Sequence, residues 1–300
     1  MHRYIAFCKI VELGSFTRAA EALGYTQAAV SQIVRSLENE FKLNLIIRMR
    51  TGIKLTPEGE ILYPLLLQTV TDNRQILDKI KELRGLESGE IRIGTFSSVS
   101  QNLLPKLIKK FSLEYPGVKF TLRQGDIVSI CDMIRTGMID FGFVYPNLAK
   151  GLSVVPLVRD IFLAVLPEEH SLAGKSVLTL SDLANESLIA LDEGNMNSAE
   201  NAFHAAGINP RIKYLIYDDY TILAMIEEGL GIGVLPAAIL KHTNYRFNAI
   251  PISPSISRTI GIAYQSDRLL PIAAHRFIDF MKVHISECAA GNFSVITNEE

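Results

Sequence analysis

The sequence predicts an α/β protein in three parts: a small helical head, a long linker helix and a body of two α/β lobes. Three observations carry this prediction. Short helical patterns separated by glycines fill residues 1–58, a heptad pattern occupies residues 59–86, and strand and helix patterns alternate over residues 87–300. The length of 300 residues also suits two or three compact units better than one.

The composition is typical of a globular protein, with 48% hydrophobic and 21% charged residues. The sequence contains no unbroken apolar run of about 18 residues, so it predicts no membrane span. Lys9 and Glu12 interrupt the apolar residues of the N-terminus, which therefore does not resemble a secretory signal. We expect a cytoplasmic protein with no membrane partner. The three cysteines form no CxxC pair, so we expect them to be buried hydrophobic residues, and a redox role stays an open alternative.

Charge is distributed unevenly along the chain. Residues 1–56 hold eight Lys and Arg and four acidic residues, a net charge of +4, although the whole chain carries −2. A basic head on an acidic body indicates that the head alone binds a polyanion.

The head is predicted to contain three helices. The apolar spacing predicts the first helix over residues 2–12, ended by Gly14, and the second over residues 16–23, ended by Gly24. Thr26 is a candidate N-cap for a third helix. Two short helices joined by a glycine turn form the layout of a helix-turn-helix, and the second of these helices has a polar face. We expect three apolar residues of the third helix to face the core: Val30, Ile33 and Leu37.

The polar face of the third helix has chemistry that suits DNA. Gln27, Ser31 and Arg35 recur every four residues, and Gln pairs with adenine while Arg pairs with guanine in the major groove. A turn at residues 51–52 between two β-rich pieces predicts a basic wing. An exposed amphipathic helix with a solvated Arg35 is the alternative. The expected DNA contacts are Thr17, Arg18, Thr26, Gln27, Ala28, Ser31, Gln32, Arg35, Arg48, Arg50 and Lys54.

The segment GSFTRAAEALGYTQAAVSQIVRSLENEF, followed by LIIRMRTGIKLTPEGE, resembles the winged helix-turn-helix of the LysR-type transcriptional regulators. Two segments depart from the family pattern: Thr26-Gln27-Ala28 stands where Ser-Gln-Pro or Ser-Gln-Ser is usual, and Ile46 stands where Phe is usual. The resemblance implies a regulator that binds a dyad-symmetric site on double-stranded DNA, dimerises through the linker helix and assembles further into a homotetramer.

The length and apolar pattern of the linker helix predict dimerisation independently of the resemblance. At about 1.5 Å per residue it reaches roughly 40 Å, which is too long to bury against the head alone. We expect a homodimer formed by two such helices, with packing against the chain's own body as the alternative. Pro64 must kink this helix or lie in its loosely bonded first turns. The expected heptad seam is Leu62, Leu66, Thr69, Asn73, Ile76, Ile80 and Leu83.

The body is predicted to form two α/β lobes. Strand and helix patterns alternate from Gly89 to Tyr145, which indicates a parallel sheet, and a second set follows. We expect lobe I over about 87–160 plus 266–300 and lobe II over about 161–265, with the strand that opens lobe II at residues 161–166. The arrangement resembles the periplasmic-binding-protein-like effector domain of the LysR-type regulators.

Ligands of open parallel sheets bind at the carboxyl ends of strands, here between the lobes. The hydroxyl-rich segment 95–100 follows the first strand, where one serine could equally cap the next helix. Asp126 follows the second strand, and Asp218 and Asp219 precede a helix, so capping is an alternative for all three. The hydroxyls of segment 95–100 and the free N–H groups at the start of the next helix suit a carboxylate or a similar anion. Asp218 and Asp219 favour an amine instead, and capping explains them equally well. The expected effector contacts are Thr95, Ser97, Ser98, Ser100, Asp126, Asn195, Asn197 and Asp219.

Enzyme motifs are missing from the sequence. The six histidines show no HExxH spacing, and neither a GxSxG elbow nor a phosphate-binding loop is present. GLGIG at 229–233 precedes a strand, whereas a dinucleotide fingerprint follows one. We expect a DNA-binding regulator that senses a small molecule and uses no metal or cofactor. The alternative is a solute-binding protein whose head docks a protein partner.

Overall fold

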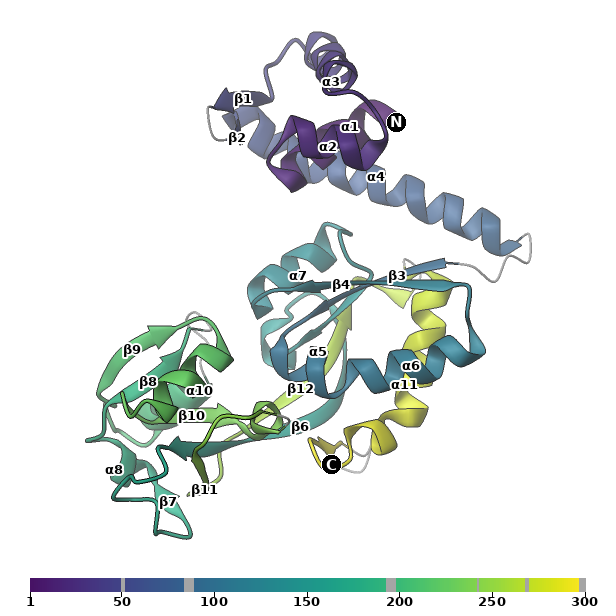
Figure 1. The fold of residues 1–300 in the computed structure, drawn as a ribbon. Helices are drawn as coiled ribbons and strands as arrows, with labels where there is room; N and C mark the ends of the chain where they lie inside the picture. Colours follow the sequence, from purple (N-terminus) through teal and green to yellow (C-terminus); the bar gives the residue numbers. More distant parts are fainter. Residues whose placement is uncertain (50–51, 84–88, 193–197, 242, 268–269, 297–300) are drawn as a thin grey trace. The chain divides into compact units, whose positions relative to one another are not determined.

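The computed structural model describes residues 1–49, 52–83, 89–192, 198–241, 243–267 and 270–296. They form two compact units. The first contains Met1–Leu86 and Arg135–Met138, and the second contains Glu87–Ile134 and Ile139–Glu300 (Figure 1).

The N-terminal unit begins with three helices and a hairpin: α1 (His2–Leu13), α2 (Phe16–Leu23), α3 (Gln27–Phe41), β1 (Ile46–Met49) and β2 (Gly52–Leu55). Gly14 and Gly24 follow α1 and α2 in the left-handed conformation, with φ of 63° and 71°, which favours glycine. The hydroxyls of Ser15 and Thr26 accept hydrogen bonds from the backbone at the starts of α2 and α3. The predicted helix limits and caps of the head are therefore confirmed.

Helix α3 buries a slightly different set of side chains from the one expected. Val30 and Leu37 are fully buried as predicted, and Val34 accompanies them, whereas Ile33 is only partly buried. Positions 30, 34 and 37 follow the helical repeat as well as positions 30, 33 and 37 do. The prediction for Ile33 was wrong because the repeat alone does not distinguish these two sets.

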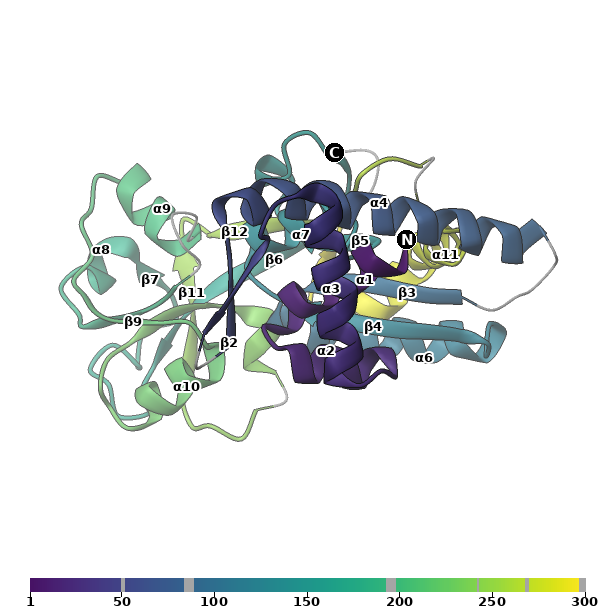
Figure 2. The same cartoon turned by 90° about the horizontal axis from the view of Figure 1, so that it is seen from above.

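The linker helix α4 (Pro57–Leu83) is continuous through Pro64 and extends well beyond the three helices of the head (Figure 2). Thr56 joins its start to the head: the hydroxyl accepts from the N–H of Gly59 (2.9 Å) and donates to the carbonyl of Asn44 (2.7 Å). A Cβ at residue 59 would overlap the carbonyl oxygen of Leu45, so this close approach of two backbones requires glycine.

The first half of α4 packs against its own head. Leu66 is buried in the head core, and Leu62 and Leu67 pack against it partly buried. The expected seam was therefore wrong at Leu62 and Leu66, which pack against the head of the same chain instead of a partner helix. A different face of α4 carries the exposed apolar side chains of Ile61, Leu65, Ile76 and Ile80. Leu77, eleven positions after Leu66 on the side that packs against the head, is also exposed.

The first lobe of the second unit contains a sheet in which β4 and β5 flank β3 in parallel, as predicted. Helices α6 and α11 pack together on one face, and α7 lies on the other (Figure 1). The elements of this lobe are β3 (Gly89–Thr95), α5 (Ser97–Asn102), α6 (Leu104–Glu114), β4 (Val118–Gln124), α7 (Ile127–Arg135), β5 (Phe141–Val144), α11 (Ile272–Ala289) and β13 (Ser294–Val295).

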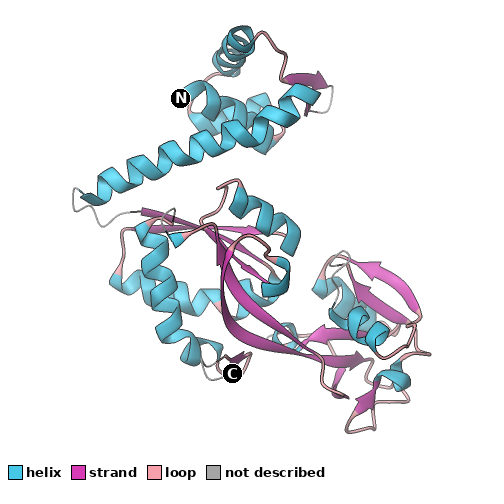
Figure 3. Cartoon of the chain, turned by 180° about the vertical axis from the view of Figure 1, so that it is seen from behind, coloured by secondary structure: helices cyan, strands magenta, loops and turns pink. Residues whose placement is uncertain are grey.

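Two long antiparallel strands connect the lobes (Figure 3). The first half of β6 (Ser153–Leu166) pairs with β12 (Ser257–Tyr264), and its second half pairs with β10 (Gly233–Pro236) and β11 (Asn248–Ser253). The expected strand at 161–166 is thus only the end of β6. Most of β12 packs in the core of the first lobe, so the chain returns there before residue 266. That correction follows from the pairing of β12 with β5 and β6.

The second lobe is smaller and is built on the parallel pair β8 and β9 beside β10. Its other elements are β7 (Leu178–Thr179), α8 (Leu180–Leu183), β8 (Leu188–Leu191), α9 (Ser198–Ala205), β9 (Ile212–Ile216) and α10 (Asp219–Glu227). No helix in the described part of the chain combines the length and apolar character needed to cross a bilayer.

All three cysteines are buried, as expected for small hydrophobic residues. Burial, with a smaller contribution from the charge of Glu12, raises the pKa of the Cys8 thiol to about 12. Burial also raises the pKa of Cys288. The thiolate is the reactive form of cysteine, so these two environments disfavour thiol chemistry.

Candidate DNA-binding face and effector cavity

Helix α3 presents a polar face to solvent. Gln27, Gln32 and Arg35 are exposed, and Ser31 is half-buried beside them. Among the described residues, the Arg35 side chain has no hydrogen-bond or ion-pair partner. Thr26 is also exposed, and its hydroxyl caps the helix by accepting from the N–H of Ala29 (3.2 Å). The α3 face therefore offers amide, hydroxyl and guanidinium groups that the fold itself leaves largely available.

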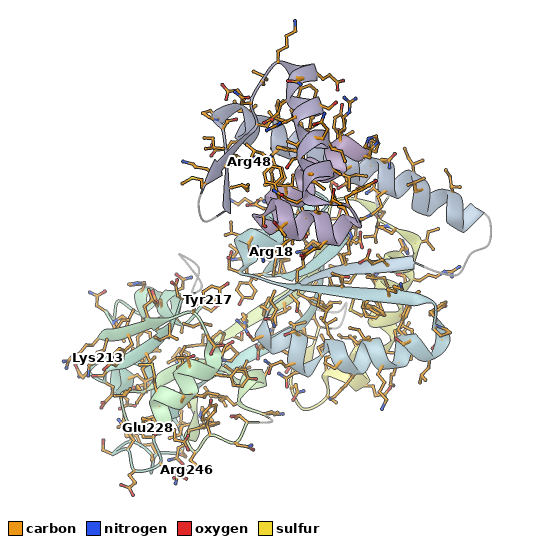
Figure 4. The ribbon with its side chains drawn as sticks, turned by 45° about the horizontal axis from the view of Figure 1, so that its top comes forward. Arg18, Arg48, Lys213, Tyr217, Glu228 and Arg246 are labelled. Atoms are coloured by element: carbon orange, nitrogen blue, oxygen red, sulfur yellow. The ribbon has the colours of Figure 1, made fainter. Side chains whose placement is uncertain are left out.

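Arg48 joins the β1–β2 hairpin to helix α3. Arg48 lies on β1 (Figure 4). Its Nη2 donates to the Ser31 hydroxyl (3.0 Å), and its guanidinium carbon lies 4.1 Å from the centre of the Phe16 ring. The sequence predicted Arg48 as a DNA contact, and the structure adds a positioning role. Because the Ser31 oxygen accepts from Arg48, its O–H stays available to donate to a base or phosphate acceptor.

Arg18 also bonds within the head. Its Nη2 donates to the carbonyl of Leu13, the last residue of α1. This bond satisfies one of the carbonyls that a helix end leaves without a helical partner. Among the other expected contacts, Thr17, Ala28 and Lys54 are exposed, and Arg50 lies outside the described residues.

Substituting Arg18 tests this structural role. Arg18→Met removes the bond to the Leu13 carbonyl, and we expect a loss of about 0.5–1 kcal/mol in the free energy of unfolding of the head. Urea unfolding of the full-length protein measures it. Arg18→Lys, which retains a donor and the charge, is the matched control. An unchanged stability in the Met variant would show that the Leu13 bond is dispensable.

The second unit contains a cavity of about 170 Å³ lined by residues of both lobes. Four of the residues expected to contact an effector line it: Ser97, Ser98, Asp126 and Asp219. Thr95 and Ser100 do not. Thr95 is fully buried, and the Ser100 hydroxyl donates to the Ser97 carbonyl (3.2 Å) and accepts from Gln124 (3.0 Å). Asn195 and Asn197 lie outside the described residues.

Helix capping was the alternative role for the candidate effector contacts, and the outcome differs from one residue to the next. The residue that precedes α5 is Phe96, so none of the serines caps this helix by a side-chain hydrogen bond. Asp126 accepts from the N–H of Ser129 (2.9 Å) and also lines the cavity. Asp218 caps α10 by accepting from Thr221 (2.7 Å), whereas the neighbouring Asp219 lines the cavity and is 8% exposed.

The lining residue Arg258 belongs to a buried ion pair. Asp160 on β6 and Arg258 on β12 are direct cross-strand neighbours, and Nε and Nη2 of Arg258 donate to Asp160 Oδ2 (3.3 and 3.1 Å). The Asp160 side chain is fully buried and that of Arg258 is 5% exposed. Nη2 also donates to the Ser98 hydroxyl (3.1 Å), and Nη1 donates to the Tyr145 hydroxyl.

Aromatic rings surround the same guanidinium. Its carbon lies between 5.2 and 5.4 Å from the ring centres of Phe96, Tyr145 and Phe162. Ring faces attract cations, so these contacts stabilise the charge at this depth. The pair sits where β6 exchanges its partner β12 for β10 and β11, at the crossing between the lobes.

Sequence reasoning missed several cavity residues: Phe96, Gln124, Tyr145, Asp192, Tyr217 and Arg258. Tyr217 follows β9 and is labelled in Figure 4. One signal could have found the ion pair. Asp160 and Arg258 are charged residues within strands that carry several large apolar residues, and charged residues are rarely buried unless they are paired.

The two units define a class of protein: a helix-turn-helix with a wing, joined by a long helix to a two-lobed body that holds a polar cavity. Comparison with known families agrees with this class. Residues 1–60 match the bacterial regulatory helix-turn-helix of the lysR family, and residues 84–285 match the LysR substrate binding domain. The chain belongs to the LysR family of bacterial transcriptional regulators, which are DNA-binding proteins and not enzymes.

Individual relatives support the same assignment over nearly the whole chain. The transcriptional regulator YvbU of Bacillus subtilis (strain 168) is 33% identical over 287 residues, which cover 92% of this chain and 95% of the relative. The transcriptional dual regulator GltC of the same organism is 30% identical over 264 residues, 85% and 87% of the two chains. The crystal structure of HinK, a LysR family regulator from Pseudomonas aeruginosa, matches with a TM-score of 0.60 at 25% identity and covers 95% and 98%.

Proposed function

We propose that this regulator binds a dyad-symmetric DNA site as a homodimer and that a small effector in the cavity changes how it does so. The observation that carries the proposal is the exposed face of α3, where Gln27, Gln32 and Arg35 stand together in the helix-turn-helix of a LysR family chain. Gln recognises adenine and Arg recognises guanine by paired hydrogen bonds in the major groove.

The wing supports this geometry. Arg48 ties the hairpin to Ser31 on α3 and to Phe16 on α2, so that the hairpin and the reading helix are presented as one surface. Lys54 on β2 is exposed and suits a phosphate contact. Phosphate contacts position a protein on DNA, and base contacts give it sequence preference.

The homodimer would form through the exposed apolar stripe of α4. Leu65 and Ile76 are 61% exposed each, and eleven positions, about three helical turns, place them on one side of the helix with Ile61 and Ile80. An apolar stripe of this kind is stable in water when a second helix covers it. Pairing two α4 helices would present two α3 helices to the two halves of a dyad-symmetric site.

Ile76→Asp tests this stripe. An aspartate there places a charge in the proposed helix–helix contact, so we expect dissociation to monomers at micromolar protein, measured by sedimentation velocity. Glu60→Asp, a conservative change on the same helix, is the control and should leave the oligomeric state unchanged. A dimer that survives Ile76→Asp would contradict pairing through this stripe.

The effector would act through the second unit. A ligand that contacts both lobes favours their closed arrangement, and it shifts the protein between states only by its difference in affinity for them. Two such dimers would assemble into a tetramer. Effector binding would then alter the bending of the DNA between the two bound sites.

Selection of bound fragments from randomised duplex DNA by the full-length protein tests the proposed function. We expect an interrupted inverted repeat whose affinity falls steeply as salt increases, because phosphate contacts release counterions. No enrichment, and weak binding that ignores sequence, would contradict base reading. That outcome would favour a solute-binding protein whose head docks a protein partner.

A further inference from the structure

Ser31 occupies the centre of the α3 face that is proposed to read bases. Gln27 lies about one helical turn before it and Arg35 one turn after it, and both are exposed, whereas Ser31 is half-buried. Its hydroxyl carries one O–H donor and two acceptor lone pairs. A serine whose hydroxyl rotates freely can bind donor and acceptor groups of bases alike, so its sequence preference is weak.

Arg48 restricts this freedom. Its Nη2 donates to Ser31 Oγ (3.0 Å), which within the described residues is the one hydrogen bond of the Ser31 side chain. A guanidinium has five N–H donors and no acceptor, and it is not deprotonated in proteins. The bond can therefore run only from Arg48 to Ser31, and the O–H of Ser31 must point elsewhere.

A second contact holds the Arg48 side chain in place. Its guanidinium carbon lies 4.1 Å from the centre of the Phe16 ring at the start of α2. The attraction between a cation and a ring face stabilises this position. Phe16 is itself part of the buried core of the head, so Arg48 approaches Ser31 from a defined direction although the arginine is exposed.

The direction of this hydrogen bond affects how Ser31 meets DNA. A hydroxyl that accepts from a cation is polarised, which makes its O–H a stronger donor and its remaining lone pair a weaker acceptor. In the major groove, guanine presents the acceptors N7 and O6 and thymine presents the acceptor O4, whereas cytosine presents an amino donor at N4. Ser31 therefore suits guanine or thymine better than cytosine.

We propose that Arg48 is a positioning residue that sets the base preference of Ser31 by making this serine a hydrogen-bond donor toward DNA. The inference rests on the proposed function, because it assigns a direction to one hydrogen bond of the face proposed to read bases. A phosphate contact by Arg48 would carry no such preference. Because Arg48 acts on the base through Ser31, removing Ser31 should also abolish the effect of Arg48 on base preference.

Selection by the full-length protein locates the base that Ser31 reads. Randomised duplex DNA is selected by the wild type and by Ser31→Ala, and the position that loses its preference in the variant is the one that Ser31 contacts. We expect guanine or thymine there in the wild-type site. Fluorescence anisotropy then compares the selected duplex with one that carries cytosine at this position of one half-site. We expect the wild type to bind the cytosine duplex about tenfold more weakly.

Arg48→Met removes the donor and keeps an apolar side chain against Phe16. We expect the discrimination against cytosine to fall to about twofold, because the Ser31 hydroxyl regains its freedom to accept. The readout is a ratio of two affinities, so an equal loss on all duplexes does not alter it. Lys54→Met is the matched control, because it removes an exposed positive charge from the same hairpin. It should weaken binding to both duplexes and leave their ratio unchanged.

The double variant Ser31→Ala/Arg48→Met separates positioning from direct reading. We expect it to show the same base preferences as Ser31→Ala alone, because the two residues act as one unit. If Arg48→Met fails to fold, as judged by circular dichroism, Arg48→Gln replaces it. The amide oxygen of glutamine can accept from Ser31, so this variant should also lose discrimination.

Four results would overturn the inference: cytosine at the Ser31 position of the wild-type site, no base-specific loss in Ser31→Ala, unchanged discrimination in the folded Arg48 variant, or a further change of base preference in the double variant. In each of them the wild type still selects an inverted repeat, so the proposed function stands. A wild-type protein that selects no sequence would remove the proposed function and this inference with it.

Discussion

Asp160→Asn should lower the free energy of unfolding of the second unit by about 3–5 kcal/mol, the usual cost of removing one partner from a buried ion pair. Asp160 is fully buried and accepts two hydrogen bonds from the guanidinium of Arg258. The amide retains the size of the carboxylate, so the effect reports the uncompensated charge of Arg258. Urea unfolding of the full-length protein, followed by circular dichroism, measures the change.

Two further variants give this prediction its controls. Asp279→Asn removes an exposed carboxylate and should change stability by less than about 0.5 kcal/mol. Adding Arg258→Met to Asp160→Asn removes the uncompensated charge, so the double variant should recover part of the loss. A single Asp160→Asn variant as stable as the wild type would contradict the structural importance of the pair.

Arg35→Ala should weaken binding to the selected DNA site by about 1–3 kcal/mol, roughly 5- to 150-fold. Arg35 is exposed on α3 beside Ser31 and Gln32, and the fold gives it no bonding role within the described residues. The variant should therefore keep its stability while it loses affinity. Fluorescence anisotropy with the selected duplex at fixed salt measures the affinity.

Lys9→Gln is the matched control for the loss of charge. Lys9 lies on α1, bonded to Glu12, and is not among the expected DNA contacts. It should reduce affinity slightly and equally for all duplexes. If Arg35→Ala weakened random and selected duplexes equally, Arg35 would be assigned to the DNA backbone and removed from the base-reading residues.

The head could be predicted closely because its signals are local. Glycines at positions 14 and 24 adopt the left-handed turns that end α1 and α2, and Ser15 and Thr26 cap the helices that follow. Side-chain bonds across the head could not be predicted in this way. The contact of Arg48 with Ser31 joins residues 17 positions apart on different elements.

The second unit was harder because its contacts are distant in the chain. Strand β6 was recognised only from residue 161, since Asp160 interrupts the apolar pattern, and its partner Arg258 lies 98 residues further on. The same distance concealed Arg258 from the predicted cavity. Signals at the ends of single strands sufficed for Ser98 and Asp126.

For the linker helix, some features followed from local sequence signals and others from tertiary contacts. Its length and apolar repeat were local properties, and α4 extends as far as expected. Which apolar face turned toward the head depended on tertiary packing, because Leu62 and Ile61 are both compatible with a helical stripe. Ile76 and Ile80 of the exposed stripe were on the expected seam, whereas Ile61 and Leu65 became apparent only in the folded unit.

The most direct test of the central claim, that the α3 face reads base sequence, is a parallel selection of randomised duplex DNA by the wild-type protein and by Arg35→Ala. We expect an inverted repeat from both proteins, with the variant losing its preference at one base position in each half-site and keeping the others. Identical base preferences from the two proteins would contradict it.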